Sequence, residues 1–221
     1  MKYIIHEPLI YLFIPLAIVF LAREYVTFRN ILPLKYLLTP SIPAMLAGMV
    51  IMAVWYTGID RYSILIITAL MLSMIADVML MIVEIDLLKY GIVYFLLAHV
   101  VYIFAFSVGY QFQPWNAVIG AFLLASVILF YYRIGRHGGK LRIPVFVYSV
   151  VLALMIYFAF SHLGNGNPAG ILVAIGGALF AISDTCLAYN AFKKKIPHSS
   201  VITWATYGPA QFLFALSCFY Q

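Results

Sequence analysis

Two aspartates lie inside strongly apolar stretches of this sequence, and their chemistry is the easiest to define. A carboxylate at the centre of a membrane helix costs at least about 2.5 to 3.5 kcal/mol on insertion scales, so Asp77 and Asp184 are expected to have a partner or a function. The sequence has no Gly-x-Ser-x-Gly, His-Glu-x-x-His or P-loop motif. Two carboxylates without a nucleophile favour acid-base chemistry. A structural hydrogen-bond cluster between helices is the alternative interpretation.

Other polar residues are predicted at the depth of these aspartates. With a rise of about 1.5 Å per residue, Asp77 and Asp184 lie roughly 9 and 12 Å from one end of their helices. His99 and Gln211 lie roughly 14 and 16 Å from the same end of theirs, so four helices bring polar residues to one layer. The further polar residues that share a helical face or a turn with this layer are Ser73, Tyr102 and Tyr207.

Neither a metal nor a cofactor is predicted. His99 is the one histidine well inside an apolar stretch of the sequence, which excludes a zinc site with three histidines. A mixed site of His99, Asp77 and Asp184 is a weaker interpretation than acid-base chemistry. For His99 itself, a neutral imidazole bonded to a backbone carbonyl is the alternative to a functional role.

The composition excludes a water-soluble protein. Of 221 residues, 66% are hydrophobic and 9% are charged, whereas a soluble globular domain has roughly 25% charged residues. The mean hydropathy is +1.05. The sequence therefore predicts a single transmembrane domain over residues 1–221. Nucleic-acid binding is not supported by the net charge of +6, because the basic residues lie in short loops and not in one patch.

Breaks in the apolar pattern predict an all-α membrane bundle of about eight transmembrane helices, each near the roughly 20 residues that a span requires. The predicted spans are Pro8 to Ala22, Tyr36 to Trp55, Tyr62 to Val83, Tyr90 to Val108, Trp115 to Tyr132, Ile143 to Ser161, Pro168 to Phe192 and Ser200 to Tyr220. Seven spans are the alternative, because the first is short and the fourth follows closely on the third.

The basic residues fall on one side of this bundle. Eight spans place 11 of the 13 Lys and Arg residues in four alternate loops and leave Lys2 and Arg61 on the other side. The positive-inside rule then predicts four cytoplasmic loops and both termini on the non-cytoplasmic side. We expect a bacterial inner membrane, or the endoplasmic reticulum in a eukaryote. The arginines around Arg136 could hold a phosphate, although the same rule explains them.

A weak internal likeness links the two halves of the chain. Ala-Asp-Val-Met-Leu (Ala76 to Leu80) is similar to Ser-Asp-Thr-Cys-Leu (Ser183 to Leu187). Each is followed by an aromatic-rich helix that ends in Phe-Ala-Phe-Ser or Phe-Ala-Leu-Ser. Two four-helix halves in a parallel repeat would account for this pattern.

Two stretches near the C-terminus are distinctive: Ile-Ser-Asp-Thr-Cys-Leu-Ala-Tyr-Asn-Ala-Phe (Ile182 to Phe192) and Tyr-Gly-Pro-Ala-Gln-Phe-Leu-Phe-Ala-Leu-Ser (Tyr207 to Ser217). They resemble the C-terminal signature of the YhhN-like lysoplasmalogenase family. The stretches Ser73 to Leu80 and Phe95 to Phe106 resemble that family's third and fourth spans. The likeness covers nearly the whole chain at the level of eight spans.

This resemblance implies hydrolysis of the vinyl ether bond of lysoplasmalogens, which gives a fatty aldehyde and glycerophosphocholine or glycerophosphoethanolamine. The reaction needs a proton on the alkene carbon and then water on the resulting oxocarbenium ion, as in glycoside cleavage by two carboxylates. One carboxyl group held away from water can stay protonated while a second stays ionised. We expect Asp77 and Asp184 to fill these roles, in an order that the sequence leaves open, with His99 as the third catalytic residue.

The resemblance also implies a substrate-binding set and a lipid partner. The predicted binding residues, which orient water and the glycerol hydroxyl or meet the phosphate, are Asn190, Tyr207, Gln211, Tyr102, Ser73 and Lys35. The predicted partners are a lysophospholipid substrate and membrane lipid, and the oligomeric state is left open. A small transporter or lipid scramblase with paired intramembrane acids is the alternative function. A non-catalytic membrane partner protein is a third possibility.

Overall fold

The computed structural model describes residues 6–82 and 84–221, so Lys2 and Val83, the end of the third predicted span, lie outside the described residues. Within those two ranges the chain forms eight α-helices, and the prediction of an all-α fold is confirmed. They are α1 (His6–Phe28), α2 (Leu32–Thr57), α3 (Arg61–Met81), α4 (Leu88–Phe106), α5 (Pro114–Arg133), α6 (Arg142–Ser161), α7 (Pro168–Phe192) and α8 (Ser199–Ser217). Short 3₁₀ turns at Gly135–His137, Gly139–Leu141 and His162–Asn165 lie beside α6.

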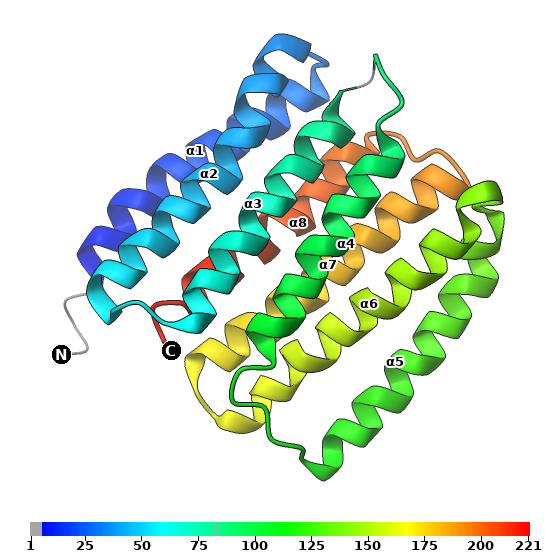
Figure 1. Ribbon diagram of the computed structural model, residues 1–221. Helices are drawn as coiled ribbons and strands as arrows, with labels where there is room; N and C mark the ends of the chain where they lie inside the picture. Colours follow the sequence, from blue (N-terminus) through cyan, green and yellow to red (C-terminus); the bar gives the residue numbers. More distant parts are fainter. Residues whose placement is uncertain (1–5, 83) are drawn as a thin grey trace.

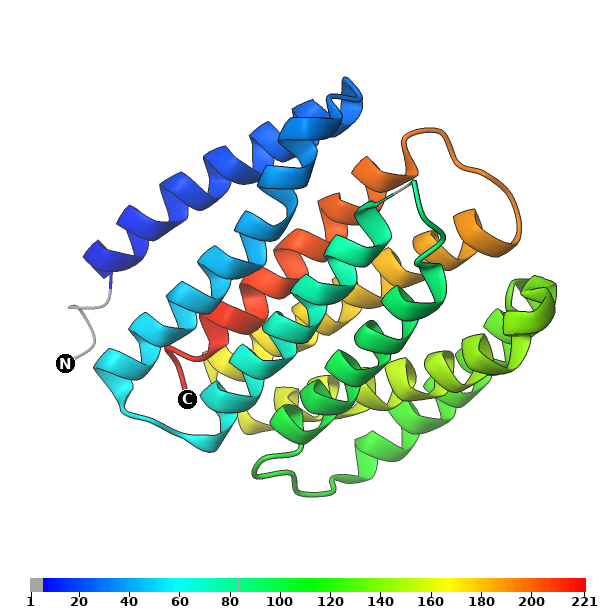
Figure 2. The same ribbon diagram turned by 45° about the horizontal axis from the view of Figure 1, so that its top comes forward.

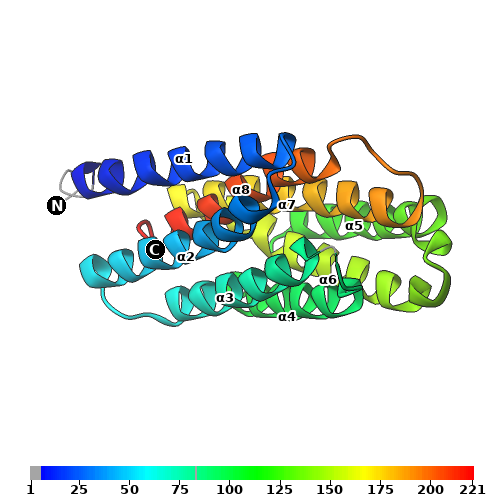
Figure 3. The same cartoon turned by 90° about the horizontal axis from the view of Figure 1, so that it is seen from above.

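The helices lie side by side in one bundle, which Figure 1 shows from the side and Figure 3 from above. The turns that close the pairs α1–α2, α3–α4, α5–α6 and α7–α8 lie at one end of the bundle, and the two chain ends lie at the other (Figures 1 and 2). The most extensive packing joins α3 to α4 and α7 to α8. Helix α5 lies at the outer edge against α6, and its buried residues are Asn116 and Val127.

Seven of the helices in the described part of the chain are long and apolar enough to cross a membrane, so this is a multi-pass membrane protein. Helix α8 is the exception among the eight. It packs against α1, α2, α3 and α7. A helix that is surrounded by protein can carry polar side chains such as Thr203 and Gln211 without exposing them to lipid. This position explains why α8 belongs to the bundle although its hydropathy is lower.

The prediction of the first two spans was too short. Helix α1 continues six residues beyond Ala22 to Phe28, and α2 begins at Leu32, four residues before Tyr36. The predicted loop from Arg23 to Lys35 therefore shrinks to residues 29–31. The charge on Arg23 does not end the helix, because that side chain finds partners inside the protein and is 1% exposed.

Candidate functional site

One group of polar residues surrounds Asp184 on α7. The Tyr148 hydroxyl, from α6, donates a hydrogen bond to Asp184 Oδ2 at 2.5 Å. His99, from α4, places Nε2 at 3.4 Å from the same oxygen, a distance within ion-pair range but longer than a normal hydrogen bond. Asp184 is 6% exposed and His99 is fully buried. Three helices thus bring an acid, an imidazole and a phenol together.

The hydrogen bonds of His99 show where a proton can lie. Its Nδ1 is 2.5 Å from the Phe95 carbonyl oxygen, which can only accept, so Nδ1 carries a hydrogen. The Nε2 atom of a neutral ring is then an acceptor that faces Asp184 Oδ2. The 3.4 Å approach to Oδ2 does not form a hydrogen bond, and Nε2 is buried without a hydrogen-bond partner among the described residues. A small movement of either side chain would bring Nε2 and Oδ2 into hydrogen-bond contact.

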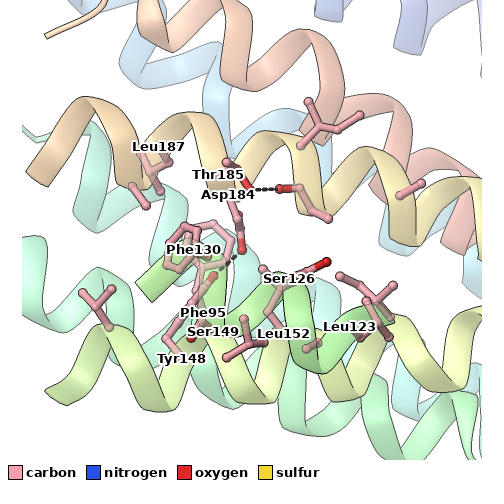
Figure 4. Close-up of a pocket in the computed structure, with 18 of the residues that line it drawn as sticks. Phe95, Leu123, Ser126, Phe130, Tyr148, Ser149, Leu152, Asp184, Thr185 and Leu187 are labelled. Carbon is pink, nitrogen blue, oxygen red and sulfur yellow. Dashed lines mark hydrogen bonds between the residues drawn. The ribbon is translucent and has the colours of Figure 1, made fainter. Parts of the chain in front are cut away.

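Asp184 also forms part of the wall of a large apolar cavity (Figure 4). The cavity has a volume of about 610 Å³ and lies between α4, α5, α6 and α7. Roughly 300 to 1,000 Å³ is the size of pockets that hold small organic ligands. Of the described residues that line it, Asp184 is the one carboxylate, and its polar neighbours on the wall are Ser126, Tyr148, Ser149 and Thr185. The rest of the wall is hydrocarbon and aromatic, as an aliphatic chain requires.

A second polar group surrounds Asp77 on α3. The Tyr207 hydroxyl on α8 donates to Asp77 Oδ2 at 2.7 Å, and Gln211 Nε2 donates to the Tyr207 oxygen at 3.0 Å. The Tyr102 hydroxyl on α4 donates to Gln211 Oε1. These three hydrogen bonds form a series in which each donor points toward Asp77, and Asp77 is the final acceptor. Asp77 is 6% exposed and does not line the cavity.

The two groups meet across a pair of aromatic rings. Phe180 lies 4.9 Å from the His99 ring and 5.3 Å from the Tyr207 ring, between centroids. Phe95 likewise contacts both rings. The prediction that Asp77, Asp184, His99 and Gln211 lie in one layer matches this arrangement, and the carboxylates interact electrostatically. The sequence could not show that the layer is divided into two hydrogen-bonded groups.

Arg23 is a buried charge that the sequence assigned to a loop. Its guanidinium donates to Glu24 Oε1 at 2.5 Å and to Ser200 Oγ at 3.1 Å, and it lies 4.1 Å from the centroid of the Trp204 ring. Its charge also attracts Asp77. The adjacent Glu24 was the signal in the sequence that Arg23 could lie inside a helix, because an Arg-Glu ion pair is neutral overall and can be buried.

The remaining predicted binding residues differ in their placement. Ser73 is fully buried one helical turn before Asp77 and belongs to the layer. Lys35 lies in the first turn of α2, where it interacts with the charge of Arg23 and not with the cavity. Asn190 Oδ1 accepts a hydrogen bond from the Ile196 amide at 2.9 Å, so it holds the turn after α7. The structure does not bring Lys35 or Asn190 to Asp184.

Tyr148 is a site residue that sequence reasoning missed. Aromatic residues at helical spacing are usually core or lipid-facing, and nothing in the α6 sequence distinguishes this tyrosine from its neighbours. A metal centre is not formed by the described side chains, among which no three His, Cys, Asp or Glu residues gather.

The chain is similar to several curated proteins. It is 31% identical to lysoplasmalogenase TMEM86B of Sus scrofa over 156 residues, which are 71% of this chain and 64% of that protein. It is 29% identical to lysoplasmalogenase TMEM86B of Rattus norvegicus and 28% identical to that of Homo sapiens, each over 128 residues. These 128 residues are 58% of this chain and 51% or 52% of the relatives, so the chain spans between half and two thirds of their length.

No solved structure matches the chain. The model of the YhhN family matches residues 34–218, which include all the helices that line the cavity. The protein therefore belongs to the YhhN family.

Proposed function

We propose that this protein hydrolyses the vinyl ether bond of lysoplasmalogens. The observation that carries the proposal is the position of Asp184, which is buried with His99 and Tyr148 and forms the one carboxylate on the wall of an apolar cavity of about 610 Å³. Such a cavity holds the alkenyl chain while the carboxyl group meets the ether. The relatives named lysoplasmalogenase support the same reaction.

Asp184 is the general acid in this proposal. Its carboxyl proton passes to the alkene carbon remote from the ether oxygen, and the carbon next to the oxygen becomes an oxocarbenium ion. The resulting carboxylate faces that cation and stabilises it, and the Tyr148 hydrogen bond stabilises the carboxylate. Asp184 then takes a proton from the attacking water. The hemiacetal that forms breaks its bond to the glycerol oxygen, which leaves as the alcohol, and releases the aldehyde.

Asp77 has a different role in this scheme. It accepts from Tyr207 and does not line the cavity, so it fixes α8 against α3 and positions the layer that contains His99. Tyr102, Gln211 and Ser73 belong to this support. The sequence-based assignment of two reacting carboxylates is thereby reduced to one reacting carboxylate and one positioning carboxylate.

The orientation in the membrane is part of the proposal. The turns that hold most of the basic residues lie at one end of the bundle (Figure 1), and the positive-inside rule assigns this end to the cytoplasm. Both chain ends then lie outside.

An internal repeat is also part of the proposal. Asp77 of α3 pairs with α8, and Asp184 of α7 pairs with α4, which is the exchange of partners expected of two duplicated helix pairs.

Aldehyde release from purified protein in detergent tests the proposed function. We expect aldehyde from an alkenyl lysophospholipid and no product from its alkyl ether or acyl ester analogue. Asp184→Asn should lower kcat by about 10²- to 10⁴-fold, which is the usual contribution of a general acid. Asp86→Asn, a change in the exposed α3–α4 turn, is the matched control. Aldehyde release by Asp184→Asn at the wild-type rate would refute the role of Asp184.

An inactive wild-type protein that remains folded would refute the hydrolase assignment. In that case lipid flux across liposomes distinguishes the alternative, a transporter or scramblase. Such a protein would move the lysolipid without forming a product.

A further inference from the structure

The cavity beside Asp184 extends along helices α5 and α6. Its walls on α5 and α6 extend from Val118 and Phe160 at one end to Phe130 and Val145 at the other. Both ends are lined by hydrocarbon and aromatic side chains. The second end lies at the α5–α6 turn, in the same region as the turns after α3 and α7 (Figure 2). The cavity wall alone therefore does not orient an amphipathic ligand, whereas a polar group beside one end would.

Two arginines lie on the same helical faces of α5 and α6 as residues that line the cavity. Arg133 follows the lining residues Ser126 and Phe130 by seven and three residues. Residues at these spacings share one helical face, so Arg133 lies on the same face of α5 as Ser126 and Phe130. Arg133 is the last residue of α5, and its side chain is exposed.

Arg142 has the same relation to α6. It precedes the lining residues Val145 and Ser149 by three and seven residues, and it is the exposed first residue of the helix. Tyr148, which holds Asp184, lies six residues further along, or about 9 Å at 1.5 Å per residue. Arg142 thus lies about two helical turns along α6 from the tyrosine that bonds to Asp184.

The turn between the arginines is tightly built. Leu141 N donates to the Gly138 carbonyl at 2.8 Å, and Gly138 N donates to the Gly135 carbonyl at 3.0 Å. A Cβ atom at Gly135 would lie 2.9 Å from the Tyr131 ring, so the turn packs closely on the end of α5. The helix ends that carry the two arginines are therefore held in a fixed relation and are not joined by a loose loop.

Neither arginine has a carboxylate partner among the described side chains. Among the described residues, the ion pairs are Arg23 with Glu24 and His99 with Asp184, both elsewhere in the bundle. Asp86, at the same end, accepts from the Leu88 amide instead. The two guanidinium groups are free to take an anion from outside the chain, and their planar donor sets match phosphate oxygens.

We propose that Arg133 and Arg142 form a binding site for the phosphate of a lysophospholipid head group at the mouth of the Asp184 cavity. This site rests on the proposed function for its substrate class and adds the orientation of that substrate. The phosphate lies at the arginines, the glycerol extends toward Asp184, and the hydrocarbon chain fills the cavity toward Phe160. The phosphate contact is thereby assigned to α5 and α6, and not to Lys35 on α2.

Binding of lipids that cannot be cleaved tests this site independently of catalysis. We would measure the Kd of full-length protein in an uncharged detergent for a 1-O-alkyl glycerophosphoethanolamine and for a 1-O-alkylglycerol, which lacks the phosphate. The variant is Arg133→Gln with Arg142→Gln. The control is Arg136→Gln with Lys140→Gln, which removes the same charge from exposed positions of the same turn.

The double arginine variant should raise the Kd of the phospholipid by about tenfold or more, since two charge-assisted contacts are lost. Its Kd for the alkylglycerol should stay within about twofold of wild type, as should both values for the control, because exposed charges without a specific contact contribute little. An equal loss for both lipids, or an equal loss in the control, would overturn the proposal. Failure of the proposed function would appear separately, as absent aldehyde from protein that still binds the phospholipid.

Discussion

Removing a single oxygen atom from Tyr148 should slow catalysis without disturbing the fold. Tyr148→Phe deletes the hydroxyl that donates to Asp184 Oδ2 at 2.5 Å and keeps the ring that packs edge-on against His99, with centroids 5.1 Å apart. The hydrogen bond strengthens when Asp184 loses its proton, because a carboxylate is a better acceptor than a carboxylic acid. Its loss therefore raises the barrier for proton transfer more than it weakens substrate binding.

The size of the effect follows from the charge on the acceptor. A hydrogen bond to a charged group contributes about 1.5 to 3 kcal/mol, so kcat should fall by roughly 10- to 150-fold with little change in KM. Initial rates of aldehyde release over a range of substrate concentrations provide both constants. Tyr157→Phe is the matched control, because Tyr157 lies on the same helix and its hydroxyl bonds to that of Tyr110 at 2.7 Å, away from the cavity.

Two results would refute this reasoning. One is a wild-type kcat in Tyr148→Phe, which would show that the hydroxyl does not act on the reacting carboxylate. The other is an equal fall in kcat for Tyr157→Phe, which would assign the effect to a general loosening of α6. Thermal unfolding of both variants in detergent distinguishes a catalytic effect from a loss of folded protein.

Two further predictions concern the packing that supports the site. Arg23→Leu should lower the free energy of unfolding by about 1 to 3 kcal/mol, because it leaves the half-buried Glu24 without its partner. Combination with Glu24→Gln should restore part of the loss, measured by thermal unfolding. Gly176→Ala should lower stability by about 1 to 3 kcal/mol, because its Cβ would lie 2.6 Å from Phe214 Cε1. Gly48→Ala, with open space around the new Cβ, should not lower the unfolding temperature.

Local chemistry was sufficient to predict much of the helical framework. Helix α7 begins and ends at the residues that the sequence predicts, because Pro168 is favoured in the first helical turn and Asn167 accepts from the Gly170 amide as a cap. The depth of the polar layer was also accessible, since it depends on the rise of a single helix and not on contacts between helices.

Contacts between distant residues were not accessible in this way. The rule that ends a span at a charge misplaced Arg23, whose partner Ser200 lies 177 residues further along the chain. The cavity forms because α5 packs against α6 and stays apart from α4 and α7. The sequence of a single helix does not determine this arrangement. The family resemblance places Asn190 in the substrate-binding set, whereas in the structure its side chain accepts from the backbone of the following turn.

The two aspartates show why equal burial does not imply equal chemistry. Both are 6% exposed, and each is bonded by a tyrosine from another helix. Asp77 receives donors that are linked to one another, so its environment is complete without a ligand. Asp184 lies 3.4 Å from His99 Nε2 and forms part of the wall of an apolar cavity that can hold a substrate carbon. A substrate in the cavity could accept a proton from Asp184. Asp77 does not line the cavity and has no such acceptor beside it. In the proposed reaction, the position of each carboxylate relative to the cavity, and not its depth, therefore decides which one acts as the acid.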